Sequence, residues 1–313
     1  MPDILIAGIA VVDAIARPID RFPAPGGLRF FDHLSISTGG CAVNAAIALA
    51  KLGIKADVAA RVGADMLGDF VSSELHSHGL STRMLARDDS RTTSFSFVAV
   101  GPAGERSFLH TTGANAAFCA DDVPLDEIRN HRVLFIAGSM LMDTLDGDQT
   151  ARLLKEARAS AATTLLDTVF VESAPPLDWQ RRIAPALPYL DYFVPSLSEA
   201  RALSGSDDPA AAARAFQQAG ARNIAIKLGS RGVFLRDADG REETIPAFDV
   251  ERVVDTTGAG DCWSAGFLAG LSGNLDFPAA ARLGNAVAAC GIQAAGATTG
   301  VTPLAAVRGR YGL

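Results

Sequence analysis

The chain has 313 residues, 49% of them hydrophobic, so it can bury a sizeable core, in either one large α/β domain or one domain with a small appendage. Its formal net charge of −7, without any run of lysine and arginine, argues against a nucleic-acid-binding surface. No apolar run reaches the length of a membrane span and no basic leader precedes the first strand, so we expect a cytoplasmic protein. The four cysteines lie far apart, which favours reduced thiols over disulfides or a zinc site.

The N-terminal segment combines a buried strand with an acid. Residues 4–9 form a continuous apolar run, which predicts a strand buried on both faces of a sheet. Asp13 follows shortly afterwards. Since ligands bind outside the carboxyl ends of strands in open α/β sheets, Asp13 is placed either to bind substrate hydroxyls or to serve as an ordinary loop acid.

Two regions do not follow an alternation of strands and helices. Residues 14–38 are interrupted by prolines and glycines, and residues 34–37 then alternate as a strand does. A second strand-like pair covers residues 93–100 and 106–111. These regions predict strands that lie outside the alternation of strands and helices.

A glycine pair opens the first helix. Gly39 and Gly40 precede an alanine-rich helix over residues 42–52, which ends at Gly53. Asn44 is the only polar side chain between Cys41 and Lys51. It either bonds to backbone near the helix start or contacts a ligand.

From residue 133 the pattern becomes regular. Strands are predicted at 133–137, 164–166, 192–194 and 224–228, with helices between them. Strands that alternate with helices predict a parallel, doubly wound sheet flanked by helices. No linker interrupts the pattern, so residues 1–313 are expected to form a single domain.

The stretch from Asp255 to Asp261 carries the strongest chemical signal. Val253 and Val254 are predicted to end a strand, and a helix begins within the stretch. Its glycines allow a ligand close to the backbone, and the free N–H groups at a helix N-terminus stabilise phosphate charge. Asp261 in the first turn is positioned to take a proton from an attacking hydroxyl. The alternative is that Asp261 only complements the helix end, but the density of polar groups favours phosphoryl transfer.

Residues 255–261, Asp-Thr-Thr-Gly-Ala-Gly-Asp, resemble the C-terminal signature of the ribokinase-like (PfkB) family of carbohydrate kinases. Residues 39–44, Gly-Gly-Cys-Ala-Val-Asn, resemble its N-terminal signature, and no Walker P-loop sequence occurs. The resemblance implies a ribokinase-like α/β fold, with a β-sheet lid formed by residues of about 14–38 and 91–113. It also implies ATP-dependent phosphorylation of a primary hydroxyl of a sugar, and a homodimer joined through the lid.

The resemblance also implies roles for individual residues. Asp261 is the general base, and Gly258, Ala259 and Gly260 form the anion hole. The sugar is bound by Asp13, Gly39, Gly40 and Asn44. The nucleotide is contacted by Lys227, Gly229, Ser230, Gly232 and Asn285. Glu199 orders the water shell of Mg²⁺, and Asp255 and Thr257 form a site for a monovalent cation such as K⁺.

One departure from the family pattern concerns the Mg²⁺ site, which we expect to be altered and not absent, and a second weakens ribose as the substrate. Ser196 stands where the family has asparagine, three residues before Glu199, and residues 139–142 are largely apolar where ribose kinases carry an acid. A nucleoside substrate would need a stacking aromatic ring near the lid, for which the candidates are Phe30, Phe31, Phe95 and Phe108. A phosphorylated or acidic sugar would need Arg29, Arg91 or Arg106 to face the cleft. A non-catalytic sugar sensor is disfavoured, because the aspartate and the anion-hole residues are intact.

Overall fold

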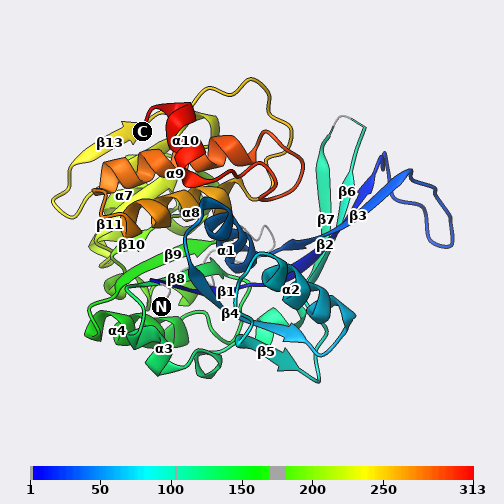
Figure 1. Cartoon of the computed structure of the whole chain (residues 1–313), viewed down its shortest axis with the longest axis horizontal. Coiled ribbons are helices and arrows are strands. Elements are labelled where there is room, and N and C mark those ends of the chain that lie inside the picture. The colour runs from blue at the N-terminus through cyan, green and yellow to red at the C-terminus, as the bar shows by residue number, and fades with distance from the viewer. Residues whose placement is uncertain (1–2, 103, 170–180) are drawn as a thin grey trace.

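The computed structural model describes residues 3–102, 104–169 and 181–313, and their strands form two separate sheets (Figure 1). The main sheet has nine strands in the order β13-β12-β11-β10-β9-β8-β1-β4-β5. In chain order these are β1 (Ile4–Gly8), β4 (Ala56–Gly63), β5 (Met84–Asp88), β8 (Val133–Ser139), β9 (Thr163–Thr168), β10 (Tyr192–Phe193), β11 (Asn223–Lys227), β12 (Val233–Arg236) and β13 (Glu242–Ile245).

The strands from β11 to β5 run parallel to their neighbours, while β12 and β13 add an antiparallel edge. The doubly wound, mainly parallel sheet predicted from the sequence is therefore confirmed. Its helices are α1 (Cys41–Leu52), α2 (Met66–Ser77), α3 (Leu125–Arg129), α4 (Asp148–Ala159), α6 (Leu197–Ser204), α7 (Pro209–Gln218), α8 (Ala259–Ser272), α9 (Phe277–Gly291) and α10 (Leu304–Tyr311). Within the described ranges, none of them is long and apolar enough to cross a membrane.

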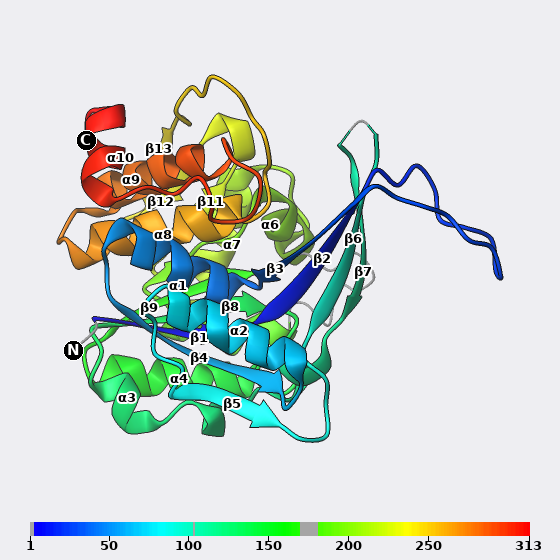
Figure 2. The same ribbon diagram turned by 45° about the vertical axis from the view of Figure 1, so that its right-hand side comes forward.

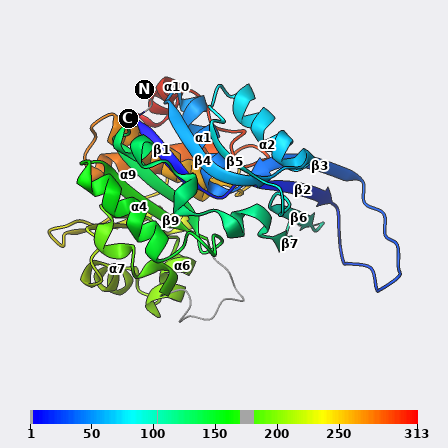
Figure 3. The same ribbon diagram turned by 90° about the horizontal axis from the view of Figure 1, so that it is seen from below.

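Helices cover both faces of the main sheet and create two apolar cores. In β1, Ile4 and Ile6 pack with α1, α2, α8, α9 and α10, while Leu5 and Ala7 pack with α3, α4, α6 and α7. Figure 3 shows α1 and α2 on one side of the sheet, and α4, α6 and α7 on the other. Because successive side chains of a strand point to opposite faces, a strand between two helical layers is apolar throughout, as residues 4–9 are.

The second sheet is the lid, and it projects from one end of the main domain (Figure 2). Its order is β3-β2-β6-β7, formed by β3 (His33–Gly39), β2 (Val11–Arg17), β6 (Phe95–Val100) and β7 (Arg106–Thr111). The strand register gives it two different faces, because directly paired residues project to the same side. One row across the strands is polar: Ser37, Asp13, Ser96 and His110. The next row, on the opposite face, is apolar: Ile36, Ala14, Phe97 and Leu109.

Three local predictions are corrected by the structure. Asp13 lies on strand β2 of the lid instead of in a loop after β1. Val253 and Val254 do not end a strand; they are 54% and 44% exposed, and the N–H of Val254 bonds the Ile292 carbonyl at 2.8 Å. The apolar spacing over about residues 278–295 predicts one helix, but α9 ends at Gly291, four residues before residue 295, because the following chain turns back toward Asp255.

Candidate active site

The two signature segments meet at the N-terminal ends of α1 and α8, which pack side by side (Figure 2). Helix α8 starts immediately after Gly258, whose φ of +68° lets the chain turn from the preceding loop into the helix. The Asn44 amide nitrogen donates a hydrogen bond of 2.7 Å to Asp261 Oδ2. Asn44 therefore lies at the helix start and reaches the proposed base at the same time.

Asp13 and Gly39 are neighbours at the base of the lid. A Cβ atom on Gly39 would lie 2.2 Å from Asp13 Oδ2, so a side chain at position 39 would collide with this carboxylate. Burial raises the pKa of Asp13, although a hydrogen bond from the Ser96 side chain partly lowers it. Glycine at position 39 therefore leaves room for the Asp13 carboxylate beside the start of α1.

A buried charge cluster lies behind Asp261. Lys227, at the end of β11, donates a bond of 2.5 Å to Asp167 Oδ2 at the end of β9. The Ser264 hydroxyl of α8 bonds the same oxygen at 3.2 Å. The Lys227 ammonium also lies 3.4 Å from the position of a Cβ on Gly260, so its charge is beside the N-terminus of α8.

This cluster shifts the pKa values of both Asp261 and Lys227. Burial raises the pKa of Asp261, and the charge of Asp167 raises it further, while the bond from Asn44 and the charge of Lys227 oppose the rise. Burial alone would lower the pKa of Lys227, but the charges of Asp167 and Glu199 outweigh burial and raise it. Lys227 thus stays protonated, and Asp261 is a stronger base than an ordinary aspartate.

Glu199 is held firmly at the start of α6. Its Oε2 accepts bonds from the Ser196 N–H at 2.6 Å and from the Thr168 hydroxyl at 3.1 Å. Ser196 is the N-cap of α6 and its hydroxyl accepts from the Glu199 N–H, so the two residues form a capping box. The serine that departs from the family pattern therefore keeps the helix-capping role that an asparagine side chain performs.

The residues expected to contact the nucleotide do not share one environment. Gly229 and Ser230 are exposed in the turn between β11 and β12, which closes at Gly232. Asn285 is only 5% exposed: its oxygen accepts from Trp263 Nε1 at 2.9 Å, and its nitrogen donates to the carbonyls of Ile245 and Pro246. The Asn285 side chain thus holds the backbone that follows β13.

Asp255 joins the turn before α8 to two other parts of the chain. Its Oδ1 accepts from the Thr257 N–H at 2.7 Å, and its Oδ2 accepts from the Gly296 N–H at 3.0 Å. Arg106 of the lid donates to Oδ1 at 2.5 Å and also to the Thr257 hydroxyl. Burial opposes ionisation of Asp255, but the N–H groups of Gly296 and Thr257 and the Arg106 guanidinium outweigh it and lower the pKa to about 2.

Sequence reasoning missed Asp167 and the contact made by Arg106. Asp167 ends a buried strand, so the rule that places Asp13 near the ligand crevice also applies to Asp167. For Arg106, the sequence carries no signal that selects Asp255, which is 149 residues away, as its partner.

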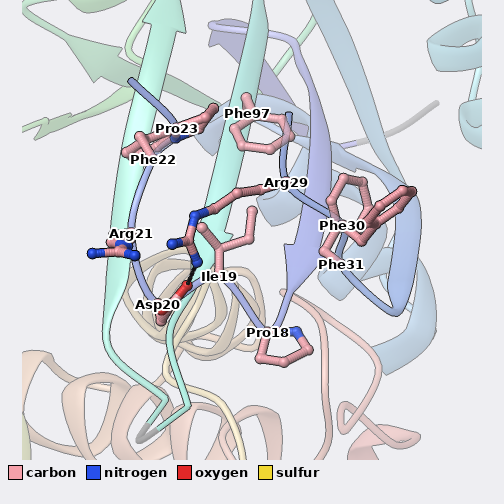
Figure 4. A pocket seen from close by; sticks show the side chains of 10 residues that line it. All are labelled: Pro18, Ile19, Asp20, Arg21, Phe22, Pro23, Arg29, Phe30, Phe31 and Phe97. Atoms are coloured by element: carbon pink, nitrogen blue, oxygen red, sulfur yellow. Dashed lines mark hydrogen bonds and ion pairs between the residues drawn. The ribbon is translucent and has the colours of Figure 1, made fainter. Parts of the chain in front are cut away.

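The remaining aromatic and arginine candidates are spread over the lid. A cavity of about 130 Å³ lies between the β2–β3 loop and β6 (Figure 4). It is lined by Pro18, Ile19, Asp20, Arg21, Phe22, Pro23, Arg29, Phe30, Phe31 and Phe97, and includes no signature residue. Arg29 pairs there with Asp20 at 2.8 Å. Phe95 packs against the core, whereas Phe108 is 59% exposed and lies on the same face of the lid as Asp13.

Comparison with known proteins decides the family. The sequence profile of the pfkB family carbohydrate kinases matches residues 1–304. The chain belongs to the pfkB family of carbohydrate kinases. The resemblance drawn from the two signatures is thereby confirmed, and with it the expected enzyme class, an ATP-dependent sugar kinase whose phosphoryl acceptor is an alcohol group.

Individual relatives agree with this assignment. An uncharacterized sugar kinase of Archaeoglobus fulgidus is 30% identical over 81% of this chain and 97% of its own length. A 2-dehydro-3-deoxygluconokinase of Bacillus subtilis is 27% identical over 88% of this chain and 87% of its own length. The solved structure of Arabidopsis thaliana ribokinase complexed with ribose and ATP superposes with a TM-score of 0.86. The superposition covers 98% of this chain and 97% of the ribokinase chain at 22% sequence identity, which confirms the ribokinase-like fold.

Proposed function

We propose that this pfkB-family kinase transfers the γ-phosphoryl group of ATP to a primary hydroxyl of a sugar or sugar derivative. The observation that supports the proposal is the 2.7 Å bond between Asn44 and Asp261. It brings the Asn44 amide, which we propose binds the sugar, beside a buried carboxylate. A hydroxyl held by Asn44 and Asp13 would lie next to Asp261, which takes its proton as the oxygen attacks. The raised pKa of Asp261 makes it a better proton acceptor at neutral pH than an ordinary aspartate.

The charge of the transferred group is stabilised at the N-terminus of α8. We expect the backbone N–H groups of Gly258, Ala259 and Gly260 at this helix start to donate to phosphoryl oxygens; in the structure the Ala259 N–H bonds the Thr256 carbonyl at 3.2 Å. The Lys227 ammonium lies beside Gly260 and adds a positive charge at the same place. Since phosphoryl transfer depends mainly on positioning and charge stabilisation, these groups supply most of what the reaction requires.

We place the nucleotide between the turn after β11 and the N-terminus of α8. Gly229, Ser230 and Gly232 let it approach the backbone, and Asn285 supports the site through the backbone of Ile245 and Pro246. Mg²⁺, when bound, neutralises phosphate charge. Both bonds to Glu199 end on Oε2, and none of the described residues bonds Oε1, which is therefore available to a water of the Mg²⁺ shell. The monovalent cation expected from the sequence at Asp255 and Thr257 is not part of this proposal.

The polar face of the lid supports a hydroxyl-rich substrate. Asp13, Ser96 and His110 form a polar row across three strands, and carboxylate, hydroxyl and imidazole groups all bond sugar hydroxyls. A nucleoside substrate is favoured by one observation, the exposed Phe108 ring on the same face, because an aromatic ring can stack on a base.

The opposite face of the lid supports a homodimer. Leu34, Ile36 and Leu109 lie on this face and are 56%, 46% and 59% exposed. Apolar side chains gathered on an exposed sheet face are typical of a surface that pairs with another chain. We propose that two copies pair through their lids.

A panel of phosphoryl acceptors tests the proposal. The purified chain is incubated with ATP and Mg²⁺ and with D-ribose, 2-dehydro-3-deoxy-D-gluconate, other hexose derivatives and adenosine, and ADP release is measured. Release that depends on a sugar and disappears in Asp261→Asn supports the proposal. Activity with adenosine alone selects the nucleoside alternative, and release that no acceptor changes contradicts both.

A further inference from the structure

Arg106 carries a contact between the lid and the turn before α8. It is the first residue of β7, and its guanidinium donates to Asp255 Oδ1 at 2.5 Å and to the Thr257 hydroxyl. Only 24% of the Arg106 side chain and 10% of the Asp255 side chain are exposed. The pair is thus largely shielded from water, where a charge-assisted bond is stronger than on the open surface.

Asp255 fixes the shape of the backbone that leads into α8. One carboxylate oxygen bonds the N–H of Thr257 within the turn, and the other bonds the N–H of Gly296 in the loop after α9. Gly258 follows at once, and a Cβ on it would lie 2.7 Å from Ala297 of the same loop. The position of the anion hole therefore depends on the bonds that the Asp255 carboxylate makes.

The contacts of Asp255 fit a monovalent cation poorly. Its Oδ1 is bonded by Arg106 and by the Thr257 N–H, and its Oδ2 is bonded by the Gly296 N–H. The Thr257 hydroxyl is also engaged by Arg106. The negative charge that would attract K⁺ is already paired with a guanidinium, and this guanidinium belongs to the lid.

We propose that Arg106 is a positioning residue for phosphoryl transfer: from the lid, it supplies the positive charge that holds the Asp255–Thr257 turn and thus the anion hole in place. The inference rests on the proposed kinase function. Arg106 acts through Asp255 and Thr257 and needs no contact with the reacting atoms. Because the charge arrives with the lid, closing the lid over the sugar orders the anion hole, and a nucleotide that orders the anion hole favours the closed lid.

Three variants separate this role from a general effect of substitution. Arg106→Met removes the charge and keeps most of the length, and Arg106→Lys keeps a charge without the two-pronged donor geometry. Arg17→Met is the matched control, because Arg17 is an exposed arginine on β2, another strand of the lid. Urea unfolding of each variant first establishes that it is folded.

The first measurement needs no knowledge of the sugar. Amide hydrogen exchange is followed over residues 254–260 and 95–111, with and without the non-hydrolysable analogue AMP-PNP and Mg²⁺. In the wild type, AMP-PNP should slow exchange in both segments together. In Arg106→Met, exchange of residues 254–260 should be faster, and AMP-PNP should no longer protect the lid segment, whereas Arg17→Met should match the wild type.

The second measurement is steady-state kcat with the acceptor found in the panel, once in KCl and once in tetramethylammonium chloride. The wild type should turn over equally in both salts. Arg106→Met should lose about 10²-fold in kcat, the typical cost of misplacing reacting groups by about 1 Å. Arg106→Lys should recover part of this loss. Stimulation of the wild type by K⁺, or unchanged exchange and kcat in Arg106→Met, would overturn the inference. If no acceptor is found, the kinase proposal fails while the exchange data still decide the role of Arg106.

Discussion

Asn44 donates a 2.7 Å hydrogen bond to Asp261, although the two residues are 217 positions apart in the sequence. The bond joins the first turn of α1 to the first turn of α8, so the two helix N-terminal ends lie next to each other. The neutral Asn44 amide donates to the Asp261 carboxylate and lowers its pKa, but burial has a larger effect and raises it.

Asp261→Asn should reduce kcat by about 10²- to 10⁴-fold, the usual contribution of a general base. Asparagine preserves the size of the side chain and removes only the proton acceptor. Affinity for AMP-PNP should stay equal or rise, because the carboxylate repels phosphate. Steady-state kcat and calorimetric AMP-PNP binding measure both effects, with Asp69→Asn, an exposed helix acid, as the control. Near-normal turnover in Asp261→Asn would remove Asp261 from the role of base.

The pH dependence of kcat/KM should show an acid limb above the ordinary aspartate range, which is about 4. The active form of Asp261 is the carboxylate, and burial raises its pKa, so activity is lost as pH falls through this raised value. The Asn44 bond opposes the rise, and Asn44→Ala should therefore move the limb to still higher pH. A limb that stays in place in Asn44→Ala, or that moves to lower pH, would show that another group controls it.

Much of the fold follows from local patterns, because the main sheet alternates with helices and its central strands are apolar throughout. The strand that was wrongly predicted to end at residues 253 and 254 shows the limit of such patterns. Val253 and Val254 have side chains that favour strands, yet they are exposed and the backbone of Val254 bonds Ile292. A contact with the end of α9 overrides the local preference.

The position of Asp261 in the first turn of a helix was predictable, since the aspartate and the helix start lie within seven residues of one another. The charged surroundings were not. Asp167, Lys227 and Arg106 each make their important contact with a residue at least 60 positions away, and only the order of strands in the sheet brings the ends of β9 and β11 close. Local patterns in a single sequence do not show which residues so far apart along the chain come into contact.

Gly39→Ala should weaken sugar binding more than nucleotide binding. The added methyl group would lie 2.2 Å from Asp13 Oδ2, so the carboxylate must move away from its present position. KM for the acceptor should rise, while the dissociation constant of AMP-PNP should change little. Gly309→Ala is the control, because nothing lies within 4 Å of the added atom and its φ is not positive. Equal effects of the two substitutions on KM would contradict a substrate-binding role for Asp13.

Lys227→Met should destabilise the fold by about 3–5 kcal/mol, the usual cost of removing one partner of a buried ion pair. Lys227 and Asp167 have side chains that are 13% and 4% exposed, and their bond is 2.5 Å long. Without the ammonium, the Asp167 carboxylate is left buried and unpaired, near Glu199 and Asp261, whose charges Lys227 also balances. Urea unfolding at neutral pH measures the free energy of unfolding.

Two further variants identify the cause of this loss. Asp167→Asn combined with Lys227→Met removes both charges, so the double variant should be more stable than Lys227→Met alone. Arg222→Met breaks a more exposed pair with Asp191, and exposed pairs contribute only about 0–1 kcal/mol. If Lys227→Met costs no more than Arg222→Met, the Lys227–Asp167 pair is not a buried charge pair in solution. If the double variant is no more stable than the single one, packing and not charge accounts for the loss.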